Sequence, residues 1–396
     1  MTAQEDFRRF LPRDGFTGTL IGRAWIPASG TQKIAGPSPV WIKAEGVFDL
    51  SPVAPTCAEL LNKGFSSKST DASKLKRIGS HEEIMANTMA SARNDALPHF
   101  LSPVDIQAVK ACGVTFVVSM LERVIEERAA GDVKKAEEIR GKIKARIGAD
   151  ISSVKPGSAK AEELKAALKS EGLWSQYLEV GIGPYAEVFT KAQPLSSVGT
   201  GAEVGILSVS SWNNPEPETV LLVDAKANVV GATLGNDVNL RDIEGRSALL
   251  LGKAKDNNAS CAIGPFIRLF DESFTLDDVR NQDVGLSIEG EDGFRLSEVS
   301  HMKKISRDLL ELVSQTLNEN HQYPDGIALF TGTLFAPTQD RGGEGKGFTH
   351  KMGDVVSIHC EKLGVLQNRV THCHQAPPWE FGISALMRNL AQRGLL

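Results

Sequence analysis

The sequence is poor in cysteine, and the few cysteines that it has are unpaired. Five are scattered over 396 residues, and no two of them form a Cys-x-x-Cys pair. An odd and widely spaced set does not make the framework of a disulfide-stapled scaffold. We therefore expect the thiols to be reduced and the fold to rest on an ordinary buried core.

Long apolar runs are also missing. No uncharged apolar run approaches the ~18 to 20 residues that cross a bilayer. The first residues, MTAQEDFRRFLPRDG, carry acids and arginines where a secretory signal needs an apolar stretch. These absences predict a cytoplasmic protein that does not enter a membrane.

The chain has no excess of basic residues either. Lys and Arg number 44 against 49 Asp and Glu, which gives a net charge of −5. Such a balance lacks the positive field that drives binding to a phosphate backbone, so nucleic acid is not expected as a partner. Hydrophobic residues at 41% and charged residues at 23% instead indicate a globular protein with a proper core.

The pattern along the chain predicts two parts. Residues 17–50 contain short β-type runs that Gly and Pro interrupt. Residues 64–95 are polar and weakly periodic, which is typical of a linker or a surface excursion. After Tyr177 strand-like runs continue almost to the end. We predict a small N-terminal β-rich domain over 1–103 and a larger, β-dominated catalytic domain over 104–396.

A helical pattern, at about 120–175, interrupts the strands near the start of the larger part. Acids and bases recur there at i, i+4 spacing around a stripe of apolar residues. A charge-laced stretch of this kind is usually a helical pair with a solvated face, and a mobile lid over a site is the alternative. The apolar stripe consists of Leu121, Val124, Ile125, Val133, Ile139, Ile143 and Ile147.

Three carboxylates are expected to meet on one face of a sheet. Side chains two apart on an extended strand share a face, so Glu216 and Glu218 point the same way. TVLLVD and VVGATL can pair as a hairpin with Asp224 opposite Val229, and this register places Glu216 opposite Asp237. Like charges opposed at ~4.5 to 5.5 Å destabilise a sheet unless something offsets the repulsion.

A hard divalent cation would offset that repulsion. Three carboxylates with positions left for water or substrate suit Mg²⁺ and, less selectively, Mn²⁺ or Ca²⁺. No His or Cys is close by in the sequence, which disfavours zinc. A solvated acidic edge is the alternative, and the sequence alone does not decide between the two.

Two basic residues follow the acidic segment. An Arg can hold a substrate carboxylate through two hydrogen bonds, which makes Arg241 a candidate for binding. A Lys beside a dication can lose its proton near neutral pH and act as a base, which makes Lys255 a candidate for catalysis. Each can equally be an ordinary surface charge.

Five motifs, in this order, give the chain a family resemblance. They are Glu216-Pro217-Glu218, Asn236-Asp237-Val238-Asn239-Leu240-Arg241-Asp242, Lys255 before Gly264-Pro265, Thr331-Gly332-Thr333, and Gly353-Asp354-Val355-Val356-Ser357-Ile358. Together they resemble the fumarylacetoacetate hydrolase superfamily over roughly residues 105 to 396. Longer stretches such as LERVIEERAAGD and HQYPDGIALF are similar to its branch of bacterial 2-keto-3-deoxypentonate dehydratases, which belong to non-phosphorylative pentose catabolism.

The resemblance implies an α+β, β-dominated fold, a mixed β-sandwich or roll with a helical insertion, assembled as a homodimer or homotetramer. It implies that Glu216, Glu218 and Asp237 bind Mg²⁺ and that the ion chelates a 2-keto acid. The residues implied in substrate binding are Arg241, Thr331, Gly332 and Thr333, with Tyr185 and Lys191 in a segment that borders the pocket.

One position departs from the carbon–carbon hydrolases of this superfamily. Their segment Asn-Tyr-x-x-His-x-x-Glu orients an attacking water, and here the His is replaced by Ser119 while the Glu survives as Glu122. The lost imidazole is the group whose pKa suits general base work at neutral pH, so the change argues against hydrolysis. A dehydratase needs no attacking water, and the acid–base pair would then be Glu122 and Lys255, with Ser119 beside them.

The expected reaction is the Mg²⁺-dependent dehydration of 2-keto-3-deoxypentonate to 2,5-dioxopentanoate. The substrate would be 2-dehydro-3-deoxy-D-arabinonate (the D-xylonate product) or its L-epimer, and the sequence does not distinguish them. The alternative is hydrolysis of a carbon–carbon bond in a 2,4-diketo-3-deoxy sugar acid, which releases pyruvate.

Overall fold

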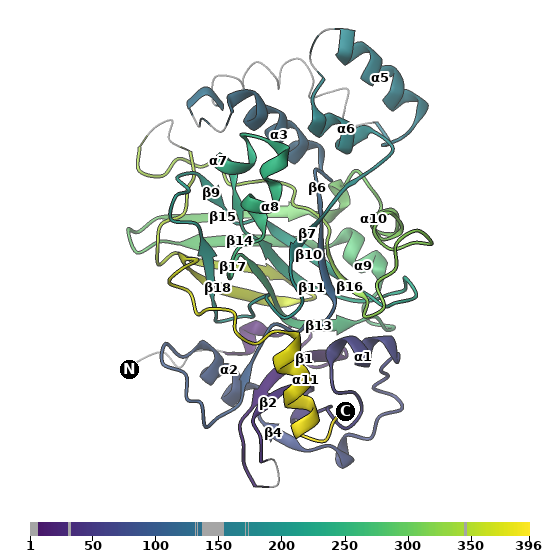
Figure 1. Cartoon of the computed structure of the whole chain (residues 1–396), viewed down its shortest axis with the longest axis vertical. Coiled ribbons are helices and arrows are strands. Elements are labelled where there is room, and N and C mark those ends of the chain that lie inside the picture. Colours follow the sequence, from purple (N-terminus) through teal and green to yellow (C-terminus); the bar gives the residue numbers. More distant parts are fainter. Residues whose placement is uncertain are drawn as a thin grey trace.

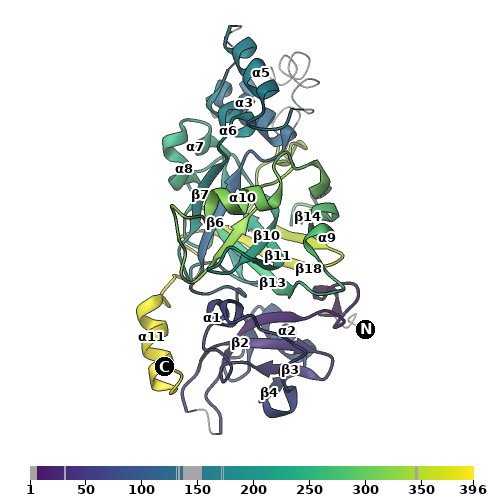
Figure 2. The same ribbon diagram turned by 90° about the vertical axis from the view of Figure 1, so that its right-hand side faces the viewer.

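The computed structural model describes residues 7–30, 33–130, 132, 134–136, 154–170, 172, 174–343 and 347–396. Within these ranges two large sheets stack on each other and helices gather at one end (Figures 1 and 2). No helix in the described part of the chain is long and apolar enough to cross a membrane.

The larger sheet contains strands from both the N-terminal part and the rest of the chain. Its strands are β1 Leu20–Ile26, β2 Gly36–Lys43, β3 Gly46–Asp49, β4 Arg77–Gly79, β5 His99–Phe100, β6 Ala108–Gly113, β7 Glu187–Ala192, β10 Pro217–Val223, β11 Val229–Asp237, β13 Cys261–Leu269 and β16 Ile327–Phe330. The order is β4-β3-β2-β1-β13-β11-β10-β16-β6-β7, with β5 paired to β1. The N-terminal strands join the rest where β1 pairs with β13, Leu20 lying opposite Arg268. A domain boundary at residue 103 stays a prediction.

The second sheet covers one face of the first. It has the order β15-β14-β17-β18-β8. These strands are β8 Glu203–Ile206, β14 Asp283–Glu289, β15 Arg295–His301, β17 Val355–Cys360 and β18 Gly364–His372. A short ribbon pairs β9 Asn213–Asn214 with β12 Asn239–Leu240.

The alternation of side chains along β10 shows how one strand serves two cores. Leu221 is buried in the core between the two sheets, together with Leu286 of the second sheet. Its neighbours Val220 and Leu222 point to the opposite face and are buried in a separate cluster. A strand covered on both faces is apolar at successive positions, as Val220–Val223 is. The predicted mixed β-sandwich is confirmed.

The helices lie at the edges of the sheets. They are α1 Cys57–Asn62, α2 His81–Met89, α3 Val117–Ala129, α5 Ala159–Ser170, α6 Gln176–Ile182, α7 Arg241–Glu244, α8 Leu251–Lys255, α9 Leu276–Asn281, α10 Leu309–Thr316 and α11 Ile383–Gln392. Short 3-10 helices are η1 Phe7–Phe10, η2 Ala72–Lys74, η3 Ala248–Leu250 and η4 Met302–Lys304. Figure 1 shows α3, α5 and α6 grouped at one end of the sheets and α11 lying against the N-terminal part at the other.

The helical pattern near the start of the larger part is confirmed for α3. Leu121, Val124 and Ile125 are buried in one cluster with residues of α6. The remaining members of the predicted stripe, Val133, Ile139, Ile143 and Ile147, lie outside the described residues. The hypothesis of a lid therefore stays a prediction.

The expectation of a linker or surface excursion over 64–95 was wrong in part, because α2 occupies His81–Met89. A reciprocal capping box between Ser80 and Glu83 starts the helix, and Ile84 and Met85 bury one side of it. Two buried apolar residues make too narrow a stripe to show as helical periodicity. The Ser-x-x-Glu spacing is the signal that marks the start of this helix.

The β10–β11 hairpin has the predicted register near the acidic end, although the predicted first pair was wrong. Val223, not Asp224, pairs with Val229, because a bulge between Leu222 and Val223 shifts the ladder. Beyond the bulge the pairs run through Glu218 opposite Gly235 to Pro217 opposite Asn236, as the predicted register requires.

Candidate active site

Three carboxylates meet at the start of β10 and the end of β11. Glu216, Glu218 and Asp237 are buried, and each offers an oxygen that lies within 4.8 Å of the others. The amide of Asp237 donates to the carbonyl of Glu216 at 3.1 Å, which places them opposite each other as predicted. Among the described residues this is the cluster of acidic, imidazole or thiol groups that can share a metal ion.

Two lysines neutralise part of this charge. The Nζ atom of Lys255 lies 2.5 Å from Glu216 Oε2 and 3.1 Å from Asp237 Oδ2. The Nζ atom of Lys191, fully buried behind the cluster, lies 2.8 Å from Asp237 Oδ1. Burial alone would raise the pKa of Asp237, but the two ammonium groups outweigh it and the pKa is lowered.

Lys255 is held in its charged form by this arrangement. Burial lowers the pKa of a lysine, but the carboxylates of Asp237 and Glu216 more than offset that effect and raise the pKa of Lys255 above its ordinary value. The ion-free arrangement therefore favours the protonated form of Lys255. Its role as a base beside a bound dication stays a prediction.

Neither lysine forms an ion pair with Glu218, the third carboxylate of the cluster. Burial raises its pKa well above the ordinary range, and the neighbouring Asp237 and Glu216 raise it further. Its Oε2 accepts a hydrogen bond of 2.6 Å from the amide of Gly332. Gly332 has a φ of +94°, and a Cβ there would lie 2.0 Å from Thr115 Oγ1, so the Thr-Gly-Thr motif needs glycine to bring this amide to the site.

A guanidinium that the sequence did not reveal also faces the cluster. Arg123 of α3 lies 2.5 Å from Glu216 Oε1, and its Nη1 atom lies 2.7 Å from Glu126 and 2.6 Å from Glu244. The charges of α3 seemed typical of a solvated helix. Ser119, Arg123 and Glu126 instead recur at i, i+4 and i+7, the spacing of one helix face, and that spacing is the signal that identifies a buried polar stripe.

Glu187, at the start of β7, is a second residue that sequence reasoning missed. Burial, and then the charge of Glu244, raise its pKa to about 7. Its carboxylate lies over Gly113, where an added Cβ would be 2.0 Å from Glu187 Oε2. The segment PYAEVFTK contains Glu187, but the resemblance implied only Tyr185 and Lys191 of that segment as residues that border the pocket.

These groups enclose one cavity, and several predicted residues lie on its wall. The lining residues are Cys112, Gly113, Val114, Ser119, Arg123, Glu187, Phe189, Glu216, Glu218, Asp237, Glu244, Lys255, Gly332 and Thr333. Ser119 donates its hydroxyl to the carbonyl of Phe116 at 3.0 Å, and Thr333 donates to the carbonyl of Phe335 at 3.0 Å. Both side chains therefore have fixed positions in the cavity.

Other predicted residues lie behind or outside this wall. Arg241 is buried against Glu126, at 2.6 Å, and its guanidinium stacks 4.2 Å above the ring of Trp212. Glu122 is buried 3.7 Å from Arg241. Thr331 donates to the carbonyl of Thr219 at 3.0 Å, and Tyr185 is 78% exposed on the surface. Substrate contact by Arg241, Thr331, Lys191 or Tyr185, and proton transfer by Glu122, stay predictions.

The charges of the site fit a divalent cation. Seven carboxylates stand against four cationic side chains in the connected network, an excess of three negative charges if all are ionised. The carboxylates are Glu122, Glu126, Glu187, Glu216, Glu218, Asp237 and Glu244, and the cations are Arg123, Lys191, Arg241 and Lys255. Burial raises the pKa values of Glu218 and Glu187, and neighbouring carboxylates raise them further. Carboxylate oxygens are the ligands that Mg²⁺ prefers, so the donor set suits that ion.

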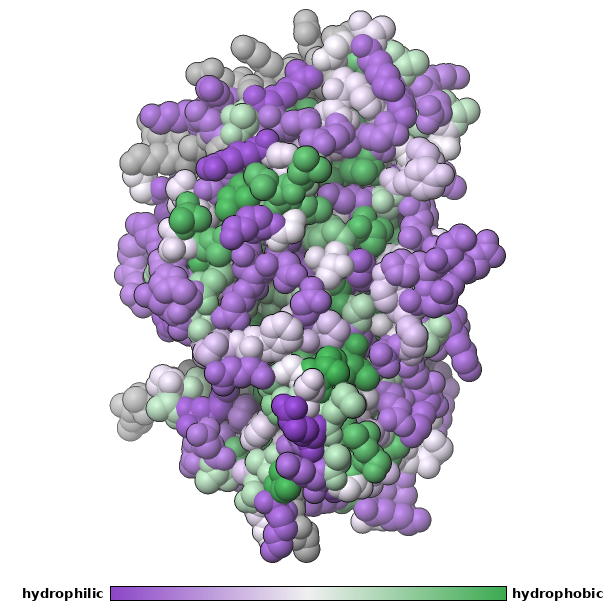
Figure 3. Space-filling model, in the orientation of Figure 1, coloured by the Kyte–Doolittle hydropathy of each residue, from purple (hydrophilic) through white to green (hydrophobic). Residues whose placement is uncertain are grey.

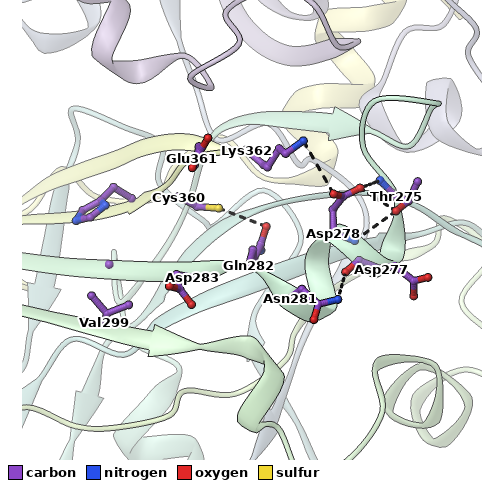
Figure 4. Close-up of a pocket in the computed structure, with 12 residues that line it drawn as sticks. Thr275, Asp277, Asp278, Asn281, Gln282, Asp283, Val299, Cys360, Glu361 and Lys362 are labelled. Atoms are coloured by element: carbon purple, nitrogen blue, oxygen red, sulfur yellow. Dashed lines mark hydrogen bonds and ion pairs between the residues drawn. The ribbon is translucent and has the colours of Figure 1, made fainter.

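A larger groove on the surface does not compete with this site. Figure 4 shows it between β14, β17 and α9. Its acidic side chains already contact other residues: Asp277 lies beside Arg280, Asp283 beside His301 and Glu361 beside Arg13. Asp278 accepts hydrogen bonds from Thr275 as the cap of α9, and the thiol of Cys360 lies 3.3 Å from Gln282 Oε1. The groove brings together no three described side chains that can share a metal ion.

Known proteins are similar to this chain over the region that contains Glu216, Glu218 and Asp237. Residues 190–371 match the family described as "Fumarylacetoacetate (FAA) hydrolase C-terminal". A "Fumarylacetoacetate hydrolase domain-containing protein 2 homolog" of Dictyostelium discoideum is 30% identical over 222 residues, which are 53% of this chain and 67% of that protein.

Two further relatives carry the name of dehydratases. A "Probable 2-keto-3-deoxyxylonate dehydratase" of Haloferax volcanii is 32% identical over 195 residues, 49% of this chain and 63% of the relative. A "2-dehydro-3-deoxy-D-arabinonate dehydratase" of Saccharolobus solfataricus is 32% identical over 183 residues, 46% of this chain and 57% of the relative. The matches thus span about three fifths of these relatives.

Solved structures share the fold. One, named "Hexagonal kristal form of 2-keto-3-deoxyarabinonate dehydratase", has a TM-score of 0.61 at 22% identity and covers 89% of this chain and 98% of its own. Another, named "2-keto-3-deoxy-D-arabinonate dehydratase complexed with magnesium and 2,5-dioxopentanoate", has a TM-score of 0.59 at 21% identity and covers 89% and 99%. At this level of identity the likeness concerns the arrangement of the chain.

Proposed function

The chain belongs to the fumarylacetoacetate hydrolase family, and from this premise we propose that it is a Mg²⁺-dependent lyase that dehydrates a 2-keto-3-deoxypentonate. The product would be 2,5-dioxopentanoate. Two relatives at 32% identity bear the names of dehydratases of this kind, which supports the reaction class. The C4 epimer, D or L, and a place in non-phosphorylative pentose catabolism are part of the proposal.

The observation that carries the proposal is the composition of the cavity wall. Ser119 stands where the carbon–carbon hydrolases of the superfamily carry the imidazole that activates water, and none of the described residues lining the cavity is a histidine. Ser119 is also bonded to the carbonyl of Phe116 and is a poor base. Dehydration needs two proton transfers and no attacking water, and Glu187 and Lys255 can provide them.

Glu216, Glu218 and Asp237 would hold the cation. When bound, Mg²⁺ supplies positive charge that polarises the 2-keto acid and makes the hydrogens at C3 more acidic. A further argument for the ion is that Lys255, the cation now placed among these carboxylates, reaches only Glu216 and Asp237 and leaves the pKa of Glu218 raised.

The proton transfers are assigned to residues on the wall. Glu187, with its pKa raised by burial to about 7, can take the C3 proton at neutral pH and return it. Lys255, held as an ammonium by Asp237 and Glu216, can protonate the C4 hydroxyl as it leaves. One water is lost and a C3–C4 double bond forms. Tautomerisation then moves a hydrogen from C5 to C3, which leaves a C4–C5 enol, and moves the hydroxyl proton of that enol to C4, which gives the C5 aldehyde, so no oxidant is required. This assignment puts Glu187 in the place first given to Glu122.

The test is incubation of the protein with the D and L epimers of 2-keto-3-deoxypentonate, with Mg²⁺ and with a chelator. A semialdehyde that an aldehyde dehydrogenase oxidises to 2-oxoglutarate, formed only with the metal, supports the proposal. If the protein releases pyruvate from a 2,4-diketo-3-deoxy sugar acid and forms no semialdehyde from either epimer, the proposal is wrong and the protein is the alternative hydrolase. A Glu187→Gln variant with undiminished turnover would reject the proton assignment alone.

We also propose that the protein self-associates as a homodimer or homotetramer. Figure 3 shows an apolar patch at the level of α7 and α8 on the face seen in Figure 1. Leu249 is 95% exposed and Val209 77%, large values for residues of this type, and Leu250 is exposed as well. Light scattering should give a mass that is a multiple of the chain's, and Leu249→Asp should reduce it. A monomeric wild-type protein would reject the proposal.

A further inference from the structure

Glu187 follows a loop whose side chains point largely to solvent. Pro184 and Tyr185 are exposed, and Ala186 is only half-buried. In the described part of the chain β7, which begins with Glu187, is the last strand of the larger sheet, so no further strand holds its outer side. The position of the loop before Glu187 therefore depends largely on the hydrogen bonds of its backbone.

Arg307 binds carbonyl groups of this loop. Its side chain is buried, and its Nη2 atom donates to the carbonyls of Val180, Gly183 and Tyr185 at 2.8, 2.7 and 3.3 Å. Val180 lies in the last turn of α6, where carbonyl groups have no partner within the helix. A cation at the C-terminus of a helix also interacts favourably with the helix dipole. Arg307 thus joins the end of α6 to the loop that leads to Glu187.

Gln315 of α10 holds the backbone directly before Glu187. Its Oε1 atom accepts a hydrogen bond of 2.6 Å from the amide of Ala186. Its Nε2 atom donates to the carbonyl of Pro184 at 3.3 Å. Both partners are backbone groups, so this contact fixes the path of the chain and not a side chain of the loop.

Glu311 connects the two contacts. Its Oε1 atom accepts hydrogen bonds from Arg307 Nη1 at 2.7 Å and from Gln315 Nε2 at 3.1 Å. Glu311 and Gln315 are four residues apart on α10, so they share one face of that helix. Leu312 and Val313 of the same helix are buried in the core between the two sheets. The polar contacts are therefore mounted on a helix that the core holds in place.

The opposite side of Glu187 is confined as well. Gly113 is its partner in the pairing of β6 with β7, and the carboxylate of Glu187 lies over that glycine. The same carboxylate lines the cavity together with Glu218 and Lys255. A shift of the backbone before Glu187 would therefore move the carboxylate relative to the groups with which it has to act.

We propose that Arg307, Glu311 and Gln315 form a clamp on residues 180–186 that sets the position of Glu187 for proton transfer. The three are positioning residues, because none of them is among the described residues that line the cavity. The proton transfer rests on the proposed function. The clamp itself can be measured whichever acid the protein transforms.

The test removes the hydrogen bonds of Gln315 and leaves Arg307 in place. Arg307 is buried, and its loss would leave three carbonyls without their donor and destabilise the fold as a whole. Gln315→Leu keeps a similar volume and removes both hydrogen bonds to the loop. The exchange E311Q/Q315E keeps the net charge and retains an oxygen at position 315 for the amide of Ala186.

Gln322→Leu is the matched control. Gln322 is exposed in the turn after α10, and its Nε2 atom donates to the carbonyls of Asn318 and Glu319. The same change of residue type thus removes two hydrogen bonds to backbone carbonyls of its own turn. All variants are compared with the wild-type protein as full chains, by steady-state kinetics of semialdehyde formation and by hydrogen–deuterium exchange of residues 183–190.

Gln315→Leu should lower kcat about 10- to 100-fold, because the rate of proton transfer falls steeply when the base is displaced. KM and the affinity for Mg²⁺ should change less than about twofold, since the ligands of the ion lie on other strands. E311Q/Q315E should restore kcat to within about threefold of the wild-type value, because it lacks only the bond to Pro184. Residues 183–190 should exchange at least about threefold faster in Gln315→Leu, and Gln322→Leu should resemble the wild-type protein in every measurement.

Several results would overturn the clamp. They are an unchanged kcat or an equal rise of KM in Gln315→Leu, no recovery in E311Q/Q315E, an equal loss in Gln322→Leu, and unchanged exchange of residues 183–190. Failure of the proposed function is separate, because it appears as a wild-type protein that forms no semialdehyde. The exchange measurement then decides whether the clamp holds the loop.

Discussion

The substitution Gly113→Ala tests the proposed role of Glu187 with one methyl group. The backbone of Gly113 is not in the left-handed region, so alanine fits its conformation without strain. The added Cβ would lie 2.0 Å from Glu187 Oε2 and 2.8 Å from its carboxyl carbon. Because a Cβ does not approach other heavy atoms closer than about 3.0 Å, the carboxylate has to withdraw by at least about 1 Å.

A displacement of that size is large for a group that transfers a proton. A misplacement of ~1 Å can cost about 10²-fold in rate. We therefore expect Gly113→Ala to lower kcat for dehydration by about 100-fold. The melting temperature should change little, because the moved carboxylate lies on the wall of a cavity.

The assay is initial-rate formation of the semialdehyde at saturating substrate and Mg²⁺. Gly252→Ala is the matched control, since nothing lies within 4 Å of a Cβ at that exposed helical position. A Gly113→Ala protein that retains the wild-type kcat would refute the reasoning, because Glu187 would then have lost its position without any effect on the chemistry. A similar loss in Gly252→Ala would show that the decrease is unspecific.

Three other outcomes follow from the same network. Glu218→Gln should weaken Mg²⁺ binding, measured by calorimetry, at least about 100-fold, because a ligand of the ion loses its charge. The ion-free fold should not be destabilised, since burial and the neighbouring carboxylates disfavour the charge that is removed. An unchanged affinity for Mg²⁺ would contradict the metal site. Arg123→Met should lower the free energy of unfolding by about 3–5 kcal/mol in urea titrations, because Glu126 and Glu244 lose their partner; an unchanged urea midpoint contradicts the network. The pKa of Glu187, raised from 4.5 to about 7, means that the folded protein keeps a proton that the unfolded chain releases, so stability should fall as pH rises from about 5 to 7, by about 1–3 kcal/mol. Glu187→Gln should remove that slope, and an equal slope in the variant would assign it to other groups.

The parts of the site that the sequence predicted are those fixed by local geometry. A strand alternates strictly, so Glu216 and Glu218 had to share a face, and a hairpin register carried Asp237 to them. The register survived a wrong first pair because the bulge at Val223 lies on the turn side of all later pairs. The wrong loop length at the turn therefore left the predicted pairs at the acidic end of the hairpin unchanged.

The parts that escaped prediction depend on contacts distant in sequence. Arg123 binds Glu216, 93 residues away, and Arg241 binds Glu126, 115 residues away. Seen locally, each of these charges belongs to a polar helix face, and nothing in LERVIEERAAGD shows whether that face meets water or another element. Arg241 illustrates this ambiguity, because its partner Glu126 lies on α3, far away in the sequence, while its contact with a substrate stays a prediction.

Charge connects these findings. A net charge of −5 is unremarkable over the whole chain, but an excess of three carboxylates within one connected buried network is not. Burial raises the pKa values of Glu218, Glu187 and Glu244 above the ordinary value, and neighbouring carboxylates raise them further. A ligand that brings two positive charges to the folded state alone would relieve that repulsion and stabilise it by linkage. We therefore expect Mg²⁺ to increase the free energy of unfolding more at neutral pH than at pH 5. This expectation follows from the residues themselves, whichever acid the protein transforms.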